Sequence, residues 1–223
     1  RSLLLLAILF LLLLSSVNAQ VSFDRIRRAS SEPQNWLTYS GSYSGQRYSL
    51  LRQLTAANVR NLEQKWVFQA ESLEKFETTP LVVDGVMYLT QAPSDVVALD
   101  ARTGRVFWTY RYFNSPNVQP CCGQVNHGLA ILGDSLFLAA LDAHLVALDR
   151  RTGRVAWSFE TAQPVSSTPV AANGIVLAGC RDFGIHGLAE DDGTPRWTHS
   201  YIFSWVESSP AVVGGIADFG SSD

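Results

Sequence analysis

Cys121 and Cys122 are neighbours in the sequence, and no other residues of this chain point so directly to chemistry by type and spacing. A disulfide between adjacent residues closes a tight, strained ring and would form a hard, flat surface. Because the chain has three cysteines, two reduced thiols, or pairing of one of them with Cys180, are the alternatives. With no further cysteine nearby, the spacing disfavours a zinc site at the pair.

A repeated segment indicates the elements that must position such residues. Residues 97–108 read VALDARTGRVFW, residues 146–157 read VALDRRTGRVAW, and residues 187–197 hold a weaker copy. In each full copy, the apolar start predicts the end of a strand and Asp-x-x-Thr-Gly predicts a tight turn, in which glycine takes a positive φ. The residues that follow predict a second strand ending in tryptophan. The unit is therefore a β-hairpin with an aromatic anchor.

Two further sets of residues share one period. Tryptophans recur at positions 66, 108, 157 and 197, and glycines within apolar stretches recur at positions 85, 133, 174 and 215. A period of about 40–50 residues with short apolar strands and glycine turns indicates four-stranded β-propeller blades. No long stretch has helical periodicity. We therefore predict an all-β fold, a β-propeller with each tryptophan buried between neighbouring blades, and the alternative is a stack of hairpins or a β-sandwich.

The length predicts an incomplete propeller. At about 45 residues per blade, 223 residues supply about four blades, and residues 208–223 read as the opening of the last one. A closed propeller would not end on an unpaired strand. We therefore expect a fragment of a longer protein, with the partial propeller domain over residues 20–223.

Residues 1–19 read as a secretory signal peptide cleaved after Ala19. The apolar run over residues 3–14 would span roughly 18 Å as a helix, short of the roughly 30 Å of a bilayer core. The remainder has the composition of a globular protein, with a formal net charge of −3 and no basic cluster beyond residues 25–28. Because phosphate binding needs clustered Lys and Arg, nucleic acid is not an expected partner.

Three segments together resemble a known family. They are NWLTY at 35–39 with Tyr48 and Ser49, ETTPLVVDGVMY at 77–88, and CCGQVNHGLA at 121–130. They are similar to the N-terminal part of the quinoprotein alcohol dehydrogenases that use pyrroloquinoline quinone (PQQ), over roughly residues 35–197. The resemblance implies an eight-bladed propeller, of which this chain would supply about four blades. In that family the quinone lies in a central cavity between a vicinal disulfide and a tryptophan, a calcium ion polarises it, and an Asp acts as base.

The resemblance assigns cofactor-binding roles by position. Cys121 and Cys122 would form the vicinal disulfide, and Glu77 matches a cofactor-contacting Glu. Ser166 falls at a Thr that bonds the cofactor, and His127 stands where the family has Arg. Arg pairs a carboxylate bidentately, whereas imidazole pairs with it more weakly and is charged only below about pH 6.5. Without the resemblance, Glu77 reads as an exposed strand-start residue and Ser166 as a polar strand-edge residue.

The resemblance also suggests a metal ligand. The segment GCRDFGIHG at 179–187 is similar to the family's calcium-binding segment, with Asp182 in place of its Glu and His186 in place of its Arg. Ca²⁺ needs six to eight oxygen ligands, and a carboxylate can be one of them. The alternative is that Asp182 is an ordinary turn residue.

The family's catalytic Asp has no match in this chain, so we assign no catalytic residue. We expect the N-terminal part of an exported, periplasmic PQQ-dependent alcohol or polyol dehydrogenase that carries part of the quinone pocket but not the general base. The expected partners are an alcohol or polyol substrate and a cytochrome c or membrane quinone as electron acceptor, with peripheral membrane association. The alternative is a non-catalytic propeller with the same repeats that serves as a scaffold in outer-membrane protein assembly.

Overall fold

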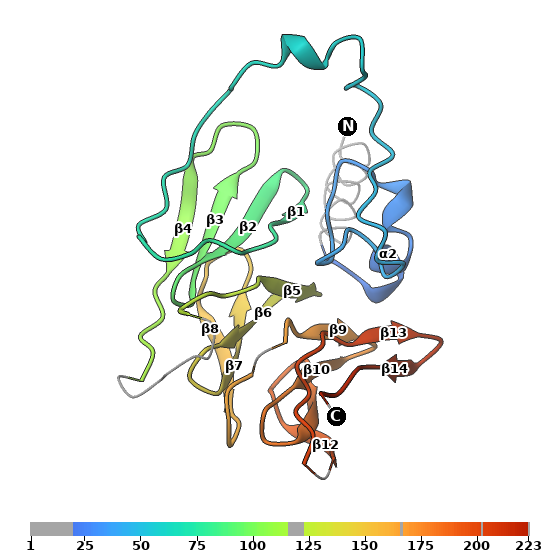
Figure 1. Cartoon of the computed structure of the whole chain (residues 1–223), viewed down its shortest axis with the longest axis vertical. Coiled ribbons are helices and arrows are strands. Elements are labelled where there is room, and N and C mark those ends of the chain that lie inside the picture. The colour runs from blue at the N-terminus through green and yellow to red at the C-terminus, as the bar shows by residue number, and fades with distance from the viewer. Residues whose placement is uncertain (1–19, 116–122, 166, 202, 223) are drawn as a thin grey trace, which may run out of the picture.

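The computed structural model describes residues 20–115, 123–165, 167–201 and 203–222. Short helical elements come first: the helix α2 (Phe23–Arg27), the 3-10 turn η2 (Ala29–Ser31) and the 3-10 turn η3 (Val59–Asn61), which lies in the long arch leading to the first sheet (Figure 1). The expected signal peptide, residues 1–19, lies outside these ranges. Within them, no helix is long and apolar enough to cross a bilayer.

The strands form antiparallel sheets in chain order. The first sheet contains β1 (Leu81–Val83), β2 (Val86–Gln91), β3 (Asp95–Asp100) and β4 (Val106–Tyr110); the second contains β5 (Leu129–Leu132), β6 (Ser135–Ala140), β7 (His144–Asp149) and β8 (Val155–Glu160). The third contains β9 (Val170–Ala172), β10 (Ile175–Gly179), β11 (Gly184–Ala189) and β12 (Pro195–Ser200), and β13 (Ala211–Val213) pairs with β14 (Ile216–Asp218). Successive four-stranded sheets of this kind are propeller blades, which confirms the predicted fold class: the described residues make three blades and the first hairpin of another.

The first hairpin of each blade turns at one of the periodic glycines. Gly85, Gly133, Gly174 and Gly215 lie between the first and second strands, all with φ between 59° and 83°. The residue before Gly85, Asp84, and the residue before Gly174, Asn173, also have positive φ, at 51° and 53°. Two consecutive residues of this conformation make the type I′ turn that matches the twist of paired strands. The need for a positive φ in each of these turns explains why glycine recurs with the period of the blades.

A tryptophan from the preceding repeat packs against the glycine of each Thr-Gly turn. A Cβ placed on Gly153, in the β7–β8 turn, would lie 2.5 Å from Trp108 of β4. Trp108 also donates its indole N–H to the carbonyl of Arg150 at 3.2 Å. Trp157 repeats the arrangement one blade further on, over Gly193. Glycine is therefore needed at these turns for its positive φ and for the close approach of the indole ring.

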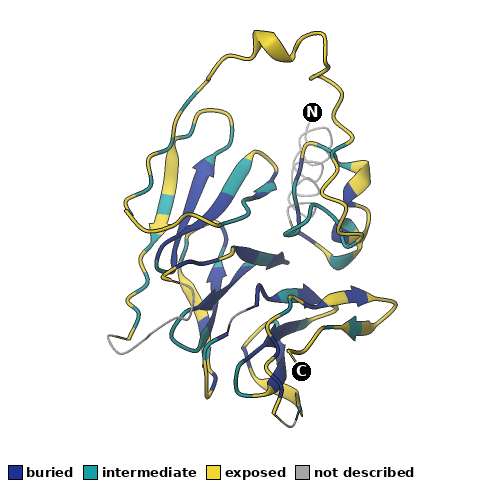
Figure 2. Ribbon diagram, viewed as in Figure 1, coloured by how far each residue is buried: buried dark blue, intermediate teal, exposed yellow. Residues whose placement is uncertain are grey.

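Tryptophan burial between blades is confirmed at Trp157, whereas Trp66 and Trp108 are only partly buried although each lies over the glycine of a following turn. Trp157 is 8% exposed and donates to the carbonyl of Glu190 at 2.8 Å. Trp197, on β12, is 42% exposed, and no described turn covers it as Gly193 covers Trp157. The whole of β12 is exposed, in contrast to the buried strands beside it (Figure 2).

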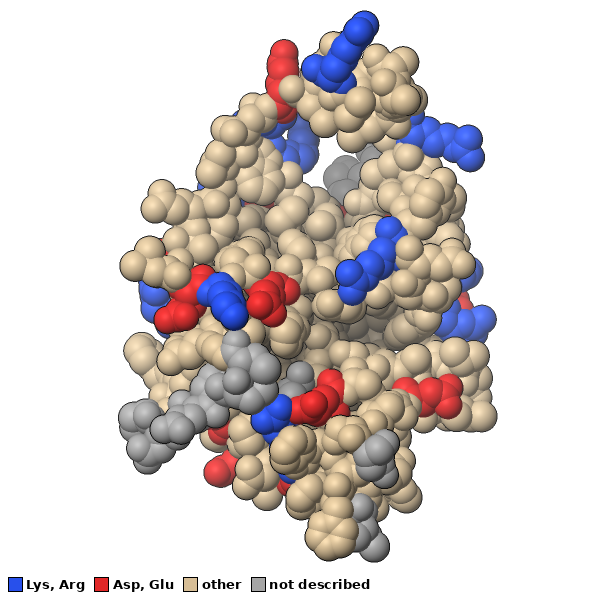
Figure 3. All heavy atoms as spheres, viewed as in Figure 1, with Lys and Arg blue, Asp and Glu red and all other residues tan. Residues whose placement is uncertain are grey.

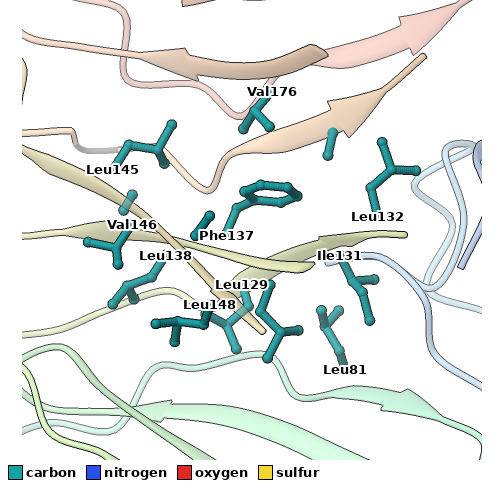
Figure 4. Packing of buried hydrophobic residues seen from close by; sticks show 14 of the residues in the cluster. Leu81, Leu129, Ile131, Leu132, Phe137, Leu138, Leu145, Val146, Leu148 and Val176 are labelled. Atoms are coloured by element: carbon teal, nitrogen blue, oxygen red, sulfur yellow. The ribbon is translucent and has the colours of Figure 1, made fainter. Parts of the chain in front are cut away.

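The main hydrophobic core lies between the blades rather than inside one of them. Leu81 from β1 packs with Leu129 and Ile131 of β5, and on the other side Phe137 of β6 faces Val176 of β10 (Figure 4). Burying apolar area stabilises the fold by about 25 cal/mol per Å². Since the buried area is shared between sheets, the blades stabilise one another.

The N-terminal segment, residues 20–43, crosses the end of the blades where the first hairpins turn. Val21 pairs with Gly133, and Trp36 pairs with Val82 of β1. Tyr43 donates its hydroxyl to the carbonyl of Ala171 of β9 at 3.4 Å. The segment therefore contacts all three four-stranded blades.

An ion-pair cluster fixes this segment to the first blade. Arg25 on α2 binds Glu32 at 2.7 Å and Asp84, in the β1–β2 turn, at 2.5 Å. The guanidinium lowers the pKa of both carboxyl groups below their ordinary values. On the face shown in Figure 3, basic and acidic side chains are interspersed rather than separated into patches of one charge.

Candidate functional site

The inner strands of neighbouring blades run parallel, which places their first residues at one end of the molecule. Thr79, before β1, forms a parallel bridge with Gly128, before β5, and the amide of Thr79 donates to the carbonyl of His127 at 3.2 Å. The β10–β11 turn reaches the same end, because β10 runs antiparallel to β9. The opposite end carries the N-terminal segment. The predicted site residues therefore belong to the end where the inner strands begin.

Three of the six predicted site residues, Glu77, His127 and Asp182, can be placed. Cys121, Cys122 and Ser166 lie outside the described residues, so the vicinal disulfide remains a prediction. Among the described residues, Cys180 carries a free thiol.

A polar side chain, here called the pin, holds the start of each inner strand. Each pin stands seven residues before the hairpin glycine of its blade. Its side chain bonds the backbone of the second strand or of the residues just after it. The pins are Thr78, which accepts from the amide of Thr90 at 3.0 Å; Asn126, which donates to the carbonyl of Ala139 at 2.8 Å; Ser167, which accepts from the amide of Gly179 at 3.1 Å; and Ser208, which accepts from the amide of Gly220 at 2.7 Å.

Glu77 and His127 are adjacent in sequence to two of these pins and meet in space. The Nδ1 atom of His127 lies 3.8 Å from Oε2 of Glu77, and the two side chains are 47% and 46% exposed. The backbone beneath them is fixed, since Asn126 is buried and its Oδ1 accepts from the amide of Gly128 at 3.1 Å. Two accessible polar side chains on a rigid backbone can bind a polar ligand without first being ordered.

Asp182 lies in the β10–β11 turn and forms a compact cluster with Cys180 and His186. Its Oδ2 lies 2.8 Å from Nε2 of His186, and its Oδ1 accepts from the amide of Gly184 at 3.0 Å. The ligand atoms of Cys180, Asp182 and His186 lie within 4.8 Å of one another. Sequence reasoning did not place Cys180 in the site, although it stands two residues before Asp182 and six before His186.

The Cys180 side chain is fully buried and donates to the carbonyl of Gln163 at 2.8 Å. Burial raises the pKa of this thiol to about 11. In the metal-free protein Cys180 is therefore a protonated hydrogen-bond donor and not a reactive thiolate.

The environment of Asp182 does not fit calcium. Oδ1 of Asp182 already accepts a hydrogen bond from Gly184, Oδ2 lies 2.8 Å from Nε2 of His186, and the third side chain of the cluster offers a sulfur. Ca²⁺ selects six to eight oxygen ligands, and nitrogen and thiol groups suit other metals. Asp182 as a calcium ligand stays a prediction that this set of donors does not favour.

Comparison with known proteins identifies the class of protein. Residues 36–168 match the family model described as the glucose/ethanol/alcohol dehydrogenase β-propeller domain. The chain is 37% identical over 186 residues to the quinoprotein alcohol dehydrogenase PedH of Pseudomonas putida, a match that covers 79% of this chain and 31% of that protein. The chain belongs to this family of quinoprotein dehydrogenase propellers. It spans about 30% of the length of the curated relatives that it matches over most of its own length.

Solved structures of similar proteins agree with this family assignment. The quinohemoprotein alcohol dehydrogenase ADHIIG of Pseudomonas putida superimposes with a TM-score of 0.74 at 34% identity, over 82% of this chain and 29% of that chain. BamB from Moraxella catarrhalis superimposes with a TM-score of 0.58 at 24% identity, over 70% of this chain and 46% of that one. The second likeness shows the fold alone, because fold does not determine function.

Proposed function

We propose that this chain forms part of the quinone pocket of an exported, PQQ-dependent alcohol or polyol dehydrogenase. The observation that carries the proposal is the pairing of Glu77 with His127 at the end where the inner strands begin, in a chain of the quinoprotein dehydrogenase family. Both residues were predicted as cofactor contacts from separate segments of the sequence. The fold brings them within 3.8 Å of each other.

The chain's own residues would bind and orient the cofactor. His127 would donate a ring N–H to a cofactor carboxylate, and Glu77 would accept from a polar group beside it. The pins Thr78 and Asn126 hold the backbone beside both residues, so the backbone that carries the pair is fixed before the ligand arrives. A disulfide between Cys121 and Cys122 would offer a flat surface to the quinone, and the Ser166 hydroxyl would add a hydrogen bond. When bound, the quinone supplies the oxidising equivalent for the alcohol.

The general base is not assigned to this chain. Among the described residues at the inner-strand end, Asp182 is bonded to His186, and Glu77, which faces His127, has the proposed role of a cofactor contact. We therefore propose that the purified chain does not oxidise alcohols by itself. Periplasmic location, peripheral membrane association and a cytochrome c or membrane quinone as electron acceptor belong to the same proposal for the whole protein.

Titration of the purified chain with PQQ, followed by tryptophan fluorescence, tests the proposal. We expect saturable binding that Glu77→Gln weakens and His127→Arg strengthens by about tenfold, because guanidinium pairs a carboxylate bidentately. Glu63→Gln is the matched control: Glu63 is an exposed carboxylate that pairs with Lys65, and its removal should leave binding unchanged.

Absence of saturable binding, or equal effects of the Glu77 and Glu63 variants, would refute the quinone site and favour the scaffold alternative. Alcohol oxidation by the chain with PQQ, Ca²⁺ and an artificial dye would instead contradict the assignment of the base to residues outside this chain.

A further inference from the structure

The cluster of Cys180, Asp182 and His186 is built from three different kinds of metal ligand on one turn. Cys180 follows the end of β10, Asp182 lies in the turn, and His186 lies on β11. Cys180 is fully buried and His186 is 9% exposed, while the Asp182 side chain is 13% exposed. The structure therefore holds a sulfur, a carboxylate oxygen and an imidazole nitrogen together in a nearly dry site, with their ligand atoms within 4.8 Å of one another.

We propose that Cys180, Asp182 and His186 bind a divalent transition-metal ion with the preferences of Zn²⁺. Zinc takes thiolate, imidazole and carboxylate ligands at about 2.0–2.3 Å, so tetrahedral ligand atoms lie about 3.3–3.8 Å apart. The present separations are 2.8 Å between Asp182 and His186 and at most 4.8 Å for the other pairs, so the side chains would rotate on binding to reach this range. A fourth ligand would come from outside these three residues. The proposal does not depend on quinone binding, although Asp182 is also the residue that the resemblance assigns to the calcium ligand of the quinone site.

The hydrogen bonds of His186 would allow a metal ion to replace the proton between His186 and Asp182. The Nδ1 atom of His186 lies 3.4 Å from the hydroxyl of Thr198, which can accept its proton. The ring then presents the lone pair of Nε2 to Asp182, where the 2.8 Å contact needs one shared proton. A metal ion can replace that proton. A ligating histidine usually donates its other ring N–H to such an acceptor.

The surroundings also tolerate loss of the thiol proton. The carbonyl of Gln163, which accepts from Cys180, lies 2.7 Å from the hydroxyl of Thr161, whose one proton can go to it or to the carbonyl of Ala143 at 3.0 Å. That carbonyl can therefore keep a partner when Cys180 becomes a thiolate ligand. The amide of Gly184 holds Oδ1 of Asp182, which leaves Oδ2 directed at the metal position. Binding would then join the two strands of the β10–β11 hairpin through one ion.

Titration of the full chain with Co²⁺, a spectroscopic substitute for Zn²⁺, tests the site. We expect one ion per chain, with a thiolate-to-cobalt charge-transfer band and the intense visible bands of four-coordinate cobalt. Stoichiometric Zn²⁺ should remove these bands, and excess Ca²⁺ should not. Cys180→Ser should abolish the charge-transfer band, and His186→Gln and Asp182→Asn should each weaken affinity by at least about 100-fold.

A matched control uses the other two cysteines. The double variant Cys121→Ser, Cys122→Ser should keep the band, since Cys180 supplies the sulfur. Loss of the band in that variant, its survival in Cys180→Ser, or failure of the wild-type chain to bind Co²⁺ or Zn²⁺ would overturn the proposal. Asp182→Asn separates loss of metal binding from misfolding, because its amide oxygen can still accept the hydrogen bond from Gly184. Circular dichroism checks that this variant is folded.

Discussion

Gly153→Ala should destabilise the protein by about 2–4.5 kcal/mol, and Gly174→Ala provides a matched control. The two glycines have nearly the same φ, 70° and 75°, so alanine costs about 1–2 kcal/mol in left-handed conformation at either position. The surroundings differ. A Cβ at Gly174 meets nothing within 4 Å, whereas one at Gly153 lies 2.5 Å from Cε3 of Trp108.

The additional cost follows from displacement of the indole ring. An ordinary contact begins at 3.4 Å, so Trp108 must retreat by roughly 1 Å from its seat. A gap of about 0.5–1 Å loses about a quarter to a half of a contact's energy, and losing a buried Trp completely costs about 3–5 kcal/mol. The displacement therefore adds about 1–2.5 kcal/mol to the backbone cost in Gly153→Ala.

Urea unfolding followed by far-ultraviolet circular dichroism measures both variants against the wild type. In a Trp108→Ala background, the cost of Gly153→Ala should fall to that of Gly174→Ala, since the clash has been removed. Equal destabilisation of the two glycine variants in the wild-type background would show that the turn is not the seat of the tryptophan, and would refute this account of how blades join.

Two further predictions concern stability. Trp157→Ala should cost about 3–5 kcal/mol in urea unfolding and Trp197→Ala less than about 1 kcal/mol, because only Trp157 is covered by a following turn; similar losses would contradict this. Arg25→Met should cost about 1–3 kcal/mol near pH 7. Since Arg25 lowers the carboxyl pKa values of Glu32 and Asp84, their contribution is present above about pH 4 and is lost as pH falls through the lowered values. Unfolding from pH 7 to pH 2 should therefore show a smaller acid loss in the variant, and an unchanged pH dependence would contradict the assignment.

The repeated hairpin could be predicted from sequence because its determinants are local. In the β7–β8 turn, Oδ1 of Asp149 accepts from the amides of Arg151 and Thr152, and Gly153 supplies the positive φ. All of these groups lie within five consecutive residues, so the local sequence is sufficient to predict the turn. The glycine and tryptophan periods then predicted the number of strands per blade and the contact between blades.

The pins could not be predicted in the same way, because each acts across a hairpin. Asn126 bonds a residue 13 positions away and Ser167 one 12 positions away, so the pairing of strands must be known first. The constant seven-residue spacing before the hairpin glycine was the available signal. Glu77 and His127 were found by resemblance, but their approach to 3.8 Å depends on the bond between the first residues of two inner strands.

The cluster of Cys180, Asp182 and His186 could be predicted only in part. Cys180, Asp182 and His186 are close in sequence, but in one continuous strand the first and last of them would lie about 20 Å apart. Only the turn between β10 and β11 brings them together. Resemblance directed attention to Asp182 and to oxygen ligands. The sulfur and nitrogen beside it emerge only from the folded hairpin.

The segment of residues 20–43 has a consequence for synthesis on the ribosome. It is translated before every blade that it contacts, and Tyr43 finds its acceptor only when Ala171, 128 residues later, has emerged and joined its sheet. Because translation is vectorial, the contacts of Val21 and Trp36 need only the first two sheets, whereas the Tyr43 hydrogen bond also needs the third. That hydrogen bond can therefore form only after the third sheet is in place.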